Sequence, residues 1–326
     1  ILPGIIDLHG DAFERHIAPR PTAPFAPQIG LANTDRDAAA NGITTAWLAQ
    51  SWSWEGGRRG ADYAETVLQE LEVYRAQMLT DLRVQIRLET HVVDDHDRVL
   101  DAIARYTIDY VIFNNHLDEA LALCEENPAR LEGWAADAGR TGEEHMKIVH
   151  AAMERGPDVP RHLCALAEAF DKRGVSYGSH DDGDGETREF YAMLGAKICE
   201  FPTSRRAAKA AHAMGDPVLL GAPNVVRGGS QSGNISASDL IRDNLCDALV
   251  SDYYYPALAR AAWKMVDDGA LDLPHAWAMI SQNPADILRL HDRGRLDVGK
   301  RADFVVVNQE TRSIEATVTG GRFSYL

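Results

Sequence analysis

The segment Ile5–Asp11 reads Ile-Ile-Asp-Leu-His-Gly-Asp, an apolar run that ends in a histidine and a carboxylate. If this segment is a β-strand, the alternation of its side chains places His9 and Asp11 on the same face, pointing at the same ion. An imidazole and a carboxylate at this spacing can form half of a zinc, iron or manganese site. A surface pair of the same kind is common, so the interpretation depends on the rest of the chain.

Strand and helix patterns alternate eight times after this segment, which predicts a parallel α/β barrel of the (β/α)8, TIM-like type. The segments between the strands are amphipathic. In such a barrel the carboxyl ends of all strands meet at one mouth, so polar residues at those ends become neighbours in space. The predicted strands span residues 5–9, 43–48, 84–89, 110–114, 175–180, 197–201, 218–221 and 248–251.

Three further side chains at strand ends are candidate metal ligands, together with His9 and Asp11. Glu89 closes one apolar run, His116 follows the next, and His180 closes the one after it. A buried carboxylate is costly unless it pairs with a cation or a metal, and Arg87 on the same strand face could serve as the partner of Glu89 instead. Each lone histidine could equally be a core residue with satisfied hydrogen bonds.

Asp252 ends the eighth predicted strand in the sequence Ser-Asp-Tyr-Tyr-Tyr. A carboxylate at this point faces the candidate ions across the barrel. It is placed to accept a proton from the attacking water and to pass it to the leaving group. Without the other strand ends, this residue would be only a strand terminus.

A glycine-rich segment, Gly221–Asn234, follows the seventh strand, where barrel enzymes often hold phosphate. Glycines let backbone amides approach a ligand closely, and Arg227 offers a bidentate fork for phosphate. A surface turn is the alternative interpretation. The candidate substrate-binding residues are Asn224, Arg227, Gly228, Gly229, Ser230, Ser232 and Asn234.

Composition is compatible with a cytoplasmic enzyme. The 326 residues suit one barrel plus an accessory piece, and the formal charge of −16 disfavours nucleic acid and anionic membranes as partners. No apolar run approaches the ~20 residues of a membrane helix. The four cysteines have no CxxC spacing, which predicts reduced thiols. The sequence leaves the oligomeric state open, and a homo-oligomer is compatible with it.

Six motifs are spread along nearly the whole chain: LPGIIDLHGD at 2–11, NGITTAW at 41–47, SHDD at 179–182, EFPTS at 200–204, GAPNVVRGGSQSGN at 221–234 and SDYYYP at 251–256. In the same order, they resemble the motifs of the ribose 1-methylphosphonate 5-triphosphate diphosphatases, a family of the amidohydrolase superfamily in phosphonate catabolism. The resemblance implies hydrolysis of the triphosphate of a phosphonylated ribose with release of pyrophosphate. It also implies one or two divalent ions, zinc first, on His9, Asp11, Glu89, His116 and His180, with Asp252 as proton shuttle.

The same resemblance predicts the domain organisation. Residues 1–295 would form the metal-dependent barrel, and residues 296–326 would supply the C-terminal strands of a small accessory β-sandwich. In this family those strands pair with N-terminal ones. We therefore expect that the N-terminal part of the accessory domain precedes Ile1. The long acidic connection at 117–173 is expected to be an inserted helical excursion.

Two departures from the family pattern leave the substrate open. Gln231 replaces a histidine, and Leu117–Glu119 replaces a Pro-Gly-Gln turn. Loss of an imidazole and gain of two carboxylates both disfavour a polyanionic substrate. A hydrolase of an amide, a cyclic amide or another phosphoester is therefore an alternative, and a non-catalytic barrel in a phosphonate-processing assembly is a second one.

Overall fold

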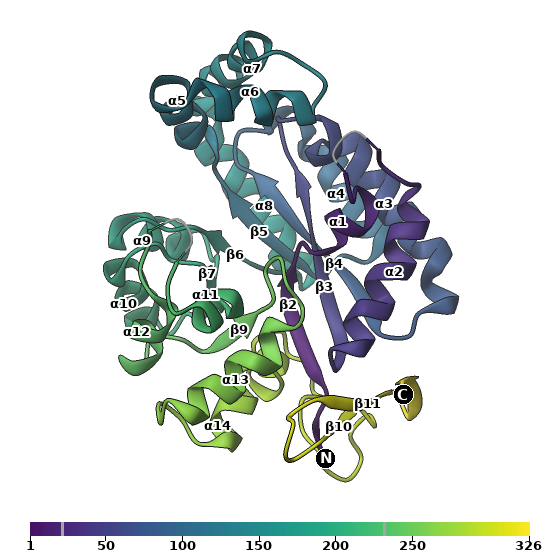
Figure 1. Cartoon of the computed structure of the whole chain (residues 1–326). Coiled ribbons are helices and arrows are strands. Elements are labelled where there is room, and N and C mark those ends of the chain that lie inside the picture. Colours follow the sequence, from purple (N-terminus) through teal and green to yellow (C-terminus); the bar gives the residue numbers. More distant parts are fainter. Residues whose placement is uncertain (21–22, 231–232) are drawn as a thin grey trace.

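The computed structural model describes residues 1–20, 23–230 and 233–326. Figure 1 shows the strands of the main sheet flanked by helices, with a group of helices at one end and a small sheet beside the chain termini at the other. The main sheet is eight-stranded and parallel, and its order follows the chain from β2 to β9. An isolated parallel bridge between Gly10 and Asp252 joins its two edges. The predicted barrel fold is confirmed.

The barrel strands lie close to their predicted positions, and two of them have the predicted bounds. The strands are β2 (Ile5–Gly10), β3 (Ile43–Trp52), β4 (Asp81–Glu89), β5 (Tyr110–Asn114), β6 (Ser176–His180), β7 (Ile198–Glu200), β8 (Val218–Gly221) and β9 (Ala248–Val250). Nearly all of their residues are buried, as expected for strands covered on both faces.

The helices bury one apolar stripe each against the outside of the sheet. In α3 the buried residues include Ala64, Val67, Leu68 and Leu71, which share one face at the helical repeat. The helices around the barrel are α1 (Phe13–Ile17), α2 (Pro27–Ala40), α3 (Ala61–Tyr74), α4 (His96–Tyr106), α8 (Val159–Arg173), α9 (Gly185–Met193), α10 (Arg205–Met214), α11 (Ala222–Arg227), α12 (Ala237–Arg242), α13 (Ala257–Asp267), α14 (Leu273–Ala278) and α15 (Gln282–Ile287).

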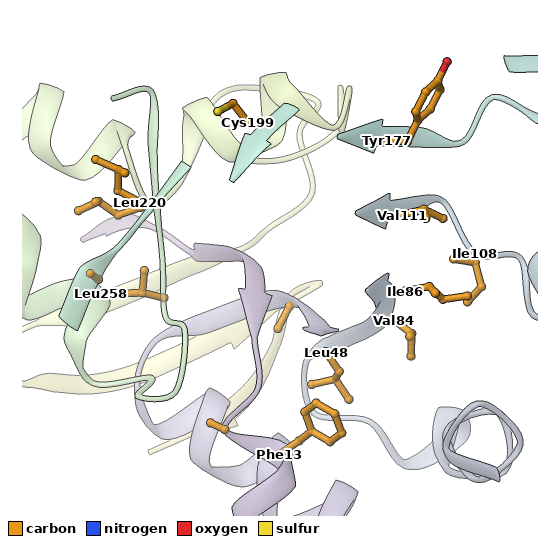
Figure 2. Close-up of a cluster of buried hydrophobic side chains, with 14 of the residues drawn as sticks. Phe13, Leu48, Val84, Ile86, Ile108, Val111, Tyr177, Cys199, Leu220 and Leu258 are labelled. Carbon is orange, nitrogen blue, oxygen red and sulfur yellow. The ribbon is translucent and has the colours of Figure 1, made fainter. Parts of the chain in front are cut away.

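The core has two layers because strand residues alternate between the two faces of the sheet. One cluster fills the barrel and includes Ile6, Leu8 and Tyr110. The larger cluster lies between the sheet and the helices, and Figure 2 shows part of it, with Ile86 and Val111 on neighbouring strands. Burial of these side chains on both faces favours the closed, helix-covered sheet.

The connection at 117–173 contains the predicted excursion, with helices α5 (Leu117–Glu126), α6 (Pro128–Asp137) and α7 (Gly142–Glu154) before α8. A capping box starts α7, because Thr141 and Glu144 bind each other's backbone amides. The three helices share a small apolar cluster of their own that includes Leu123, Leu131 and Val149. Figure 1 shows them at the end of the molecule that is remote from the small sheet.

The second sheet is antiparallel, with the order β1 (Leu2–Pro3), β10 (Phe304–Val307), β11 (Ile314–Thr319) and β12 (Arg322–Tyr325). Residues from the start of the chain therefore pair with the C-terminal strands, and the division at residues 295 and 296 stays a prediction. Among the described residues, no helix combines the length and the apolar character needed to cross a membrane.

Asp35 on α2 is a fully buried carboxylate that ties this helix to the segment leading into β4. It accepts hydrogen bonds from the Tyr74 hydroxyl at 2.9 Å and the Leu79 amide at 2.7 Å. It also accepts from the amide and hydroxyl of Thr80, at 2.9 and 2.5 Å. Four donors directed at two oxygens satisfy a group that would otherwise be costly to bury.

We predict that Asp35→Asn lowers the free energy of unfolding by on the order of 3 kcal/mol, because the amide nitrogen would face donors and leave them unpaired. Chemical denaturation measures this change. The exposed Asp101 on α4 offers a matched control, and Asp101→Asn should change stability by less than about 0.5 kcal/mol. Equal stability of the two variants would contradict the role given to Asp35.

Candidate metal centre and substrate pocket

A pocket of about 260 Å³ lies at the carboxyl ends of the barrel strands. Four of its lining residues are His9, Asp11, His180 and Asp252, which come from the ends of β2, β6 and β9. Convergence of nitrogen and oxygen donors at this point is the arrangement that the strand ends predict. These residues can therefore act on one bound molecule.

His9 is held by a buried carboxylate, Glu200 at the end of β7. The His9 Nδ1 atom lies 2.8 Å from Glu200 Oε2. The other oxygen of Glu200 accepts hydrogen bonds from Gln85 Nε2 at 2.7 Å and from the Tyr110 hydroxyl at 2.6 Å. Burial lowers the pKa of His9, but the Glu200 charge outweighs this and raises it overall. A histidine oriented in this way by a carboxylate presents Nε2 to a metal.

A break in the strand alternation aims His9 at the mouth. In the pairing of β2 with β3, Asp7 lies opposite Ala46 and Gly10 opposite Leu48, so the register shifts between Asp7 and Gly10. An irregularity of this kind adds a residue to one strand and redirects a side chain. The regular alternation that the sequence suggested for this strand end is thus not what positions His9.

His180 faces His9 across the pocket, with a distance of 5.4 Å between their ring centroids. His9, His180 and Glu200 each offer a ligand atom, and these atoms lie within 4.8 Å of one another. Burial lowers the pKa of His180, which favours the neutral imidazole that binds metals. The neighbouring Asp181 carboxylate lies 2.9 Å from His180 Nδ1.

Asp252 is fixed at the junction of the first and last barrel strands. Its amide donates to the His9 carbonyl at 3.0 Å, and its own carbonyl accepts from the Asp11 amide at 2.8 Å. Its φ of 54° lies in the left-handed region, where Asp181 (59°) and Phe201 (50°) also lie. Non-glycine residues in this region cluster at functional sites. Burial and the nearby Asp11 raise the pKa of Asp252 to about 7, a value suited to proton transfer at neutral pH.

Glu89 and His116 form a second group with Glu55, which follows β3. The Glu89 carboxylate makes a short contact with His116 Nδ1 and accepts from the Trp54 indole at 3.1 Å. Glu55 Oε1 lies 3.7 Å from His116 Nδ1 and is held by the Trp134 indole, which donates to its other oxygen. Ligand atoms of these three residues also lie within 4.8 Å of one another.

The five predicted metal ligands are therefore distributed over two neighbouring groups. His9, Asp11 and His180 line the pocket at the mouth, and Glu89 and His116 lie with Glu55 beside it. Arg87 connects the two groups electrostatically, since its charge adds to the lowering of the His180 pKa by burial and opposes the rise of the His116 pKa caused by Glu89. The role of each residue as a ligand stays a prediction.

The segment after β8 begins as a short helix and continues as a loop. Ala222–Arg227 forms the short helix α11, which ends at Gly228 with a φ of +80°, a conformation that favours glycine. The Asn224 carboxamide accepts from the Ala237 amide at 3.0 Å and so anchors the return of the chain. The segment lines the pocket through Asn224, Arg227, Gly229, Ser230 and Asn234. Gln231 and the predicted binding residue Ser232 lie outside the described residues, and Gly228 terminates the helix.

Sequence reasoning missed Glu200, Glu55 and Asp181. Glu200 ends a strand just as Glu89 does, so the same pattern could have identified it. Asp181 directly follows His180, and its position depends on a left-handed backbone conformation that no sequence pattern predicts. Glu55 lies three residues beyond the end of β3, so a search for polar residues at strand ends does not identify it.

The donor set fits a divalent ion of the first transition series. Imidazole nitrogens and carboxylate oxygens are the ligands such ions prefer, and a ligand histidine commonly donates its second nitrogen to a carboxylate. The pocket offers both His9 and His180, with Glu200 fixing His9. Asp11 and Asp252 add oxygens at the same mouth.

We predict that Glu200→Gln lowers Zn²⁺ affinity by about 10–100-fold, because the amide cannot accept from His9, Gln85 and Tyr110 together. Competition with a chromogenic chelator measures the affinity. The exposed Glu189 on α9 provides the control, and Glu189→Gln should bind Zn²⁺ like the unmodified protein. A folded Glu200→Gln protein with unchanged affinity would show that His9 needs no such support.

A family model and a curated relative both match this chain. Residues 150–324 match the model of the amidohydrolase family. The chain is 32% identical over 325 residues to the alpha-D-ribose 1-methylphosphonate 5-triphosphate diphosphatase of Escherichia coli (strain K12), with 96% of this chain and 84% of that protein covered.

Solved structures agree on the fold. N-acetylglucosamine-6-phosphate deacetylase from Pasteurella multocida aligns with a TM-score of 0.60 at 11% identity, over 99% of this chain and 86% of that one. Dihydropyrimidinase from Brevibacillus agri aligns with a TM-score of 0.61 at 12% identity, over 99% and 84%. The barrel, its extra antiparallel sheet and these matches lead to one conclusion: the chain belongs to the amidohydrolase family.

Proposed function

We propose that this chain is a metal-dependent diphosphatase that hydrolyses alpha-D-ribose 1-methylphosphonate 5-triphosphate to the 5-phosphate and pyrophosphate. The observation that carries the proposal is the composition of the pocket. Candidate metal ligands on β2 and β6 share it with Asn224, Arg227 and Ser230, which are donors suited to phosphate. The 32% identity to a diphosphatase over most of the chain supports the same substrate.

In the proposed reaction each group has a defined task. One water oxygen forms a bond to phosphorus, the bridging bond between the α and β phosphates breaks, and its electron pair leaves with pyrophosphate. Asp252, with a pKa of about 7, takes the proton of the attacking water and returns it to the leaving group. One or two divalent ions, for which we propose zinc, would polarise the phosphoryl oxygen and lower the pKa of the water.

Recognition of phosphate separates this proposal from its alternative, hydrolysis of an amide or a cyclic amide. A neutral amide needs the same water activation but presents no anion to Arg227. A phosphorylated ribose needs water activation and also a cation that binds its phosphates. The phosphate-facing side of the pocket therefore decides between the two substrate classes, and the metal side does not.

We predict release of pyrophosphate from ribose 5-triphosphates and no turnover of cyclic amides. Pyrophosphate and amine should be followed separately. Arg227→Ala should mainly raise KM for phosphorylated compounds, by on the order of 10–100-fold, because the lost contact is charge-assisted and worth roughly 1.5–3 kcal/mol. Turnover of amides alone, or an unchanged KM in the variant, would be incompatible with the proposal.

We further predict that Asp252→Asn retains its metal and loses turnover by a factor on the order of 10²–10⁴, because the amide keeps the shape and cannot accept the proton. Metal content by atomic emission and kcat at saturating substrate are the two readouts. A variant with full metal occupancy and near-normal kcat would exclude Asp252 as the proton shuttle.

A further inference from the structure

Arg87 is a half-buried cation on β4 that lies within the pocket wall. The side-chain oxygen of Asn114, in the amide orientation that satisfies both groups, accepts from Arg87 Nε and from one terminal nitrogen, each at 3.2 Å. A guanidinium has five N–H donors, so most of its hydrogen-bonding capacity is left for another partner. Asn114 thus fixes the direction of the fork without neutralising its charge.

Arg87 differs in its counter-charges from three other enclosed arginines. Arg59 lies 3.0 Å from Glu55, Arg83 lies 2.7 Å from Asp109, and Arg188 lies 3.3 Å from Asp182. Within residues 1–20, 23–230 and 233–326, no carboxylate oxygen lies within the 4.0 Å ion-pair distance of Arg87. A guanidinium withdrawn from water without an anion is costly, and such a residue beside an open pocket is typical of a ligand site.

The field of Arg87 reaches the groups that carry out the proposed chemistry. Its positive charge opposes the rise in the pKa of His9, which Glu200 causes, and the rise in the pKa of Asp252, which burial causes. It also adds to the lowering of the pKa of His180 by burial and of Asp181 by His180. Arg87 therefore lies in the wall of the same pocket as His9, His180 and Asp252 and acts on their charges.

The two arginines come from opposite sides of the barrel. The strands follow each other from β2 to β9, so β4 is the third and β8 the seventh of eight. Arg87 and Arg227 both line the pocket that separates them. Two cations on facing walls can bind two separate anionic groups of one extended molecule.

We propose that Arg87 binds the phosphoryl group at which hydrolysis occurs and that, with Arg227, it makes the site specific for a polyphosphate chain. The proposal rests on the proposed function and adds to it a residue that touches the reacting group. Charge builds up on the phosphoryl oxygens as the water adds and the bridging bond breaks. A fixed guanidinium at those oxygens stabilises that charge, and a bound neutral carbonyl substrate would leave the guanidinium without an anion.

The test uses the metal-loaded full chain and inorganic pyrophosphate as the probe. Arg87→Met should weaken pyrophosphate binding, measured by calorimetry, by about 10–100-fold, and lower kcat on the triphosphate by on the order of 10²–10³. Arg87→Lys should regain part of the affinity and little of the rate, because it restores the charge without the fork. Arg83→Met, at the other end of β4, removes an equally long side chain from a carboxylate-paired position and should change neither value.

The outcomes distinguish failure of the Arg87 site from failure of the diphosphatase proposal. Unaltered pyrophosphate affinity in a folded, metal-containing Arg87→Met protein overturns the role of Arg87 and leaves the diphosphatase proposal intact. Arg87-dependent binding of pyrophosphate without hydrolysis of the triphosphate supports the anion site and overturns the substrate. A wild-type protein that does not bind pyrophosphate overturns both. Equal loss of pyrophosphate affinity in Arg87→Lys and Arg87→Met would indicate a packing role and reject the ionic contact.

Discussion

The contact between the first and last barrel strands is the constraint on which the pocket depends. Ser251 donates to the two oxygens of the buried Asp7, through its amide at 2.8 Å and its hydroxyl at 2.6 Å. Burial raises the pKa of Asp7 to about 6, although these hydrogen bonds oppose the rise. Closure brings residues 244 positions apart into contact. His9 and Asp252 share one mouth only because these strands meet.

Much of the fold could be predicted because barrel strands are buried on both faces and leave continuous apolar runs. Tyr110–Asn114 and Val218–Gly221 have the bounds that the sequence indicates. The position of His9, His180 and Asp252 at one pocket also follows from topology, since parallel strands place their carboxyl ends together. These features depend on periodicity and on strand order, which a single sequence contains.

The details that a sequence could not provide are those set by short-range geometry. The register shift between Asp7 and Gly10 depends on how β2 fits β3, and it decides where His9 points. The grouping of Glu89 with His116 and Glu55, beside the pocket and not in its wall, depends on side-chain packing against Trp54 and Trp134. Helix α11 forms within a glycine-rich stretch because its glycines lie at the ends, and Pro223 lies in its first turn.

The charge balance of the chain explains why cations at the pocket matter more than the overall field. A net charge of −16 repels a polyanion at long range, but salt screens such repulsion beyond about 8–10 Å. Inside that distance the proposed substrate would meet Arg87 and Arg227 on facing walls. Because the net charge does not steer an anion toward the pocket, affinity for the proposed substrate would come from slow dissociation out of close, charge-assisted contacts. Under the proposed function, selectivity for phosphate is then a property of these two side chains and of the strands that hold them apart.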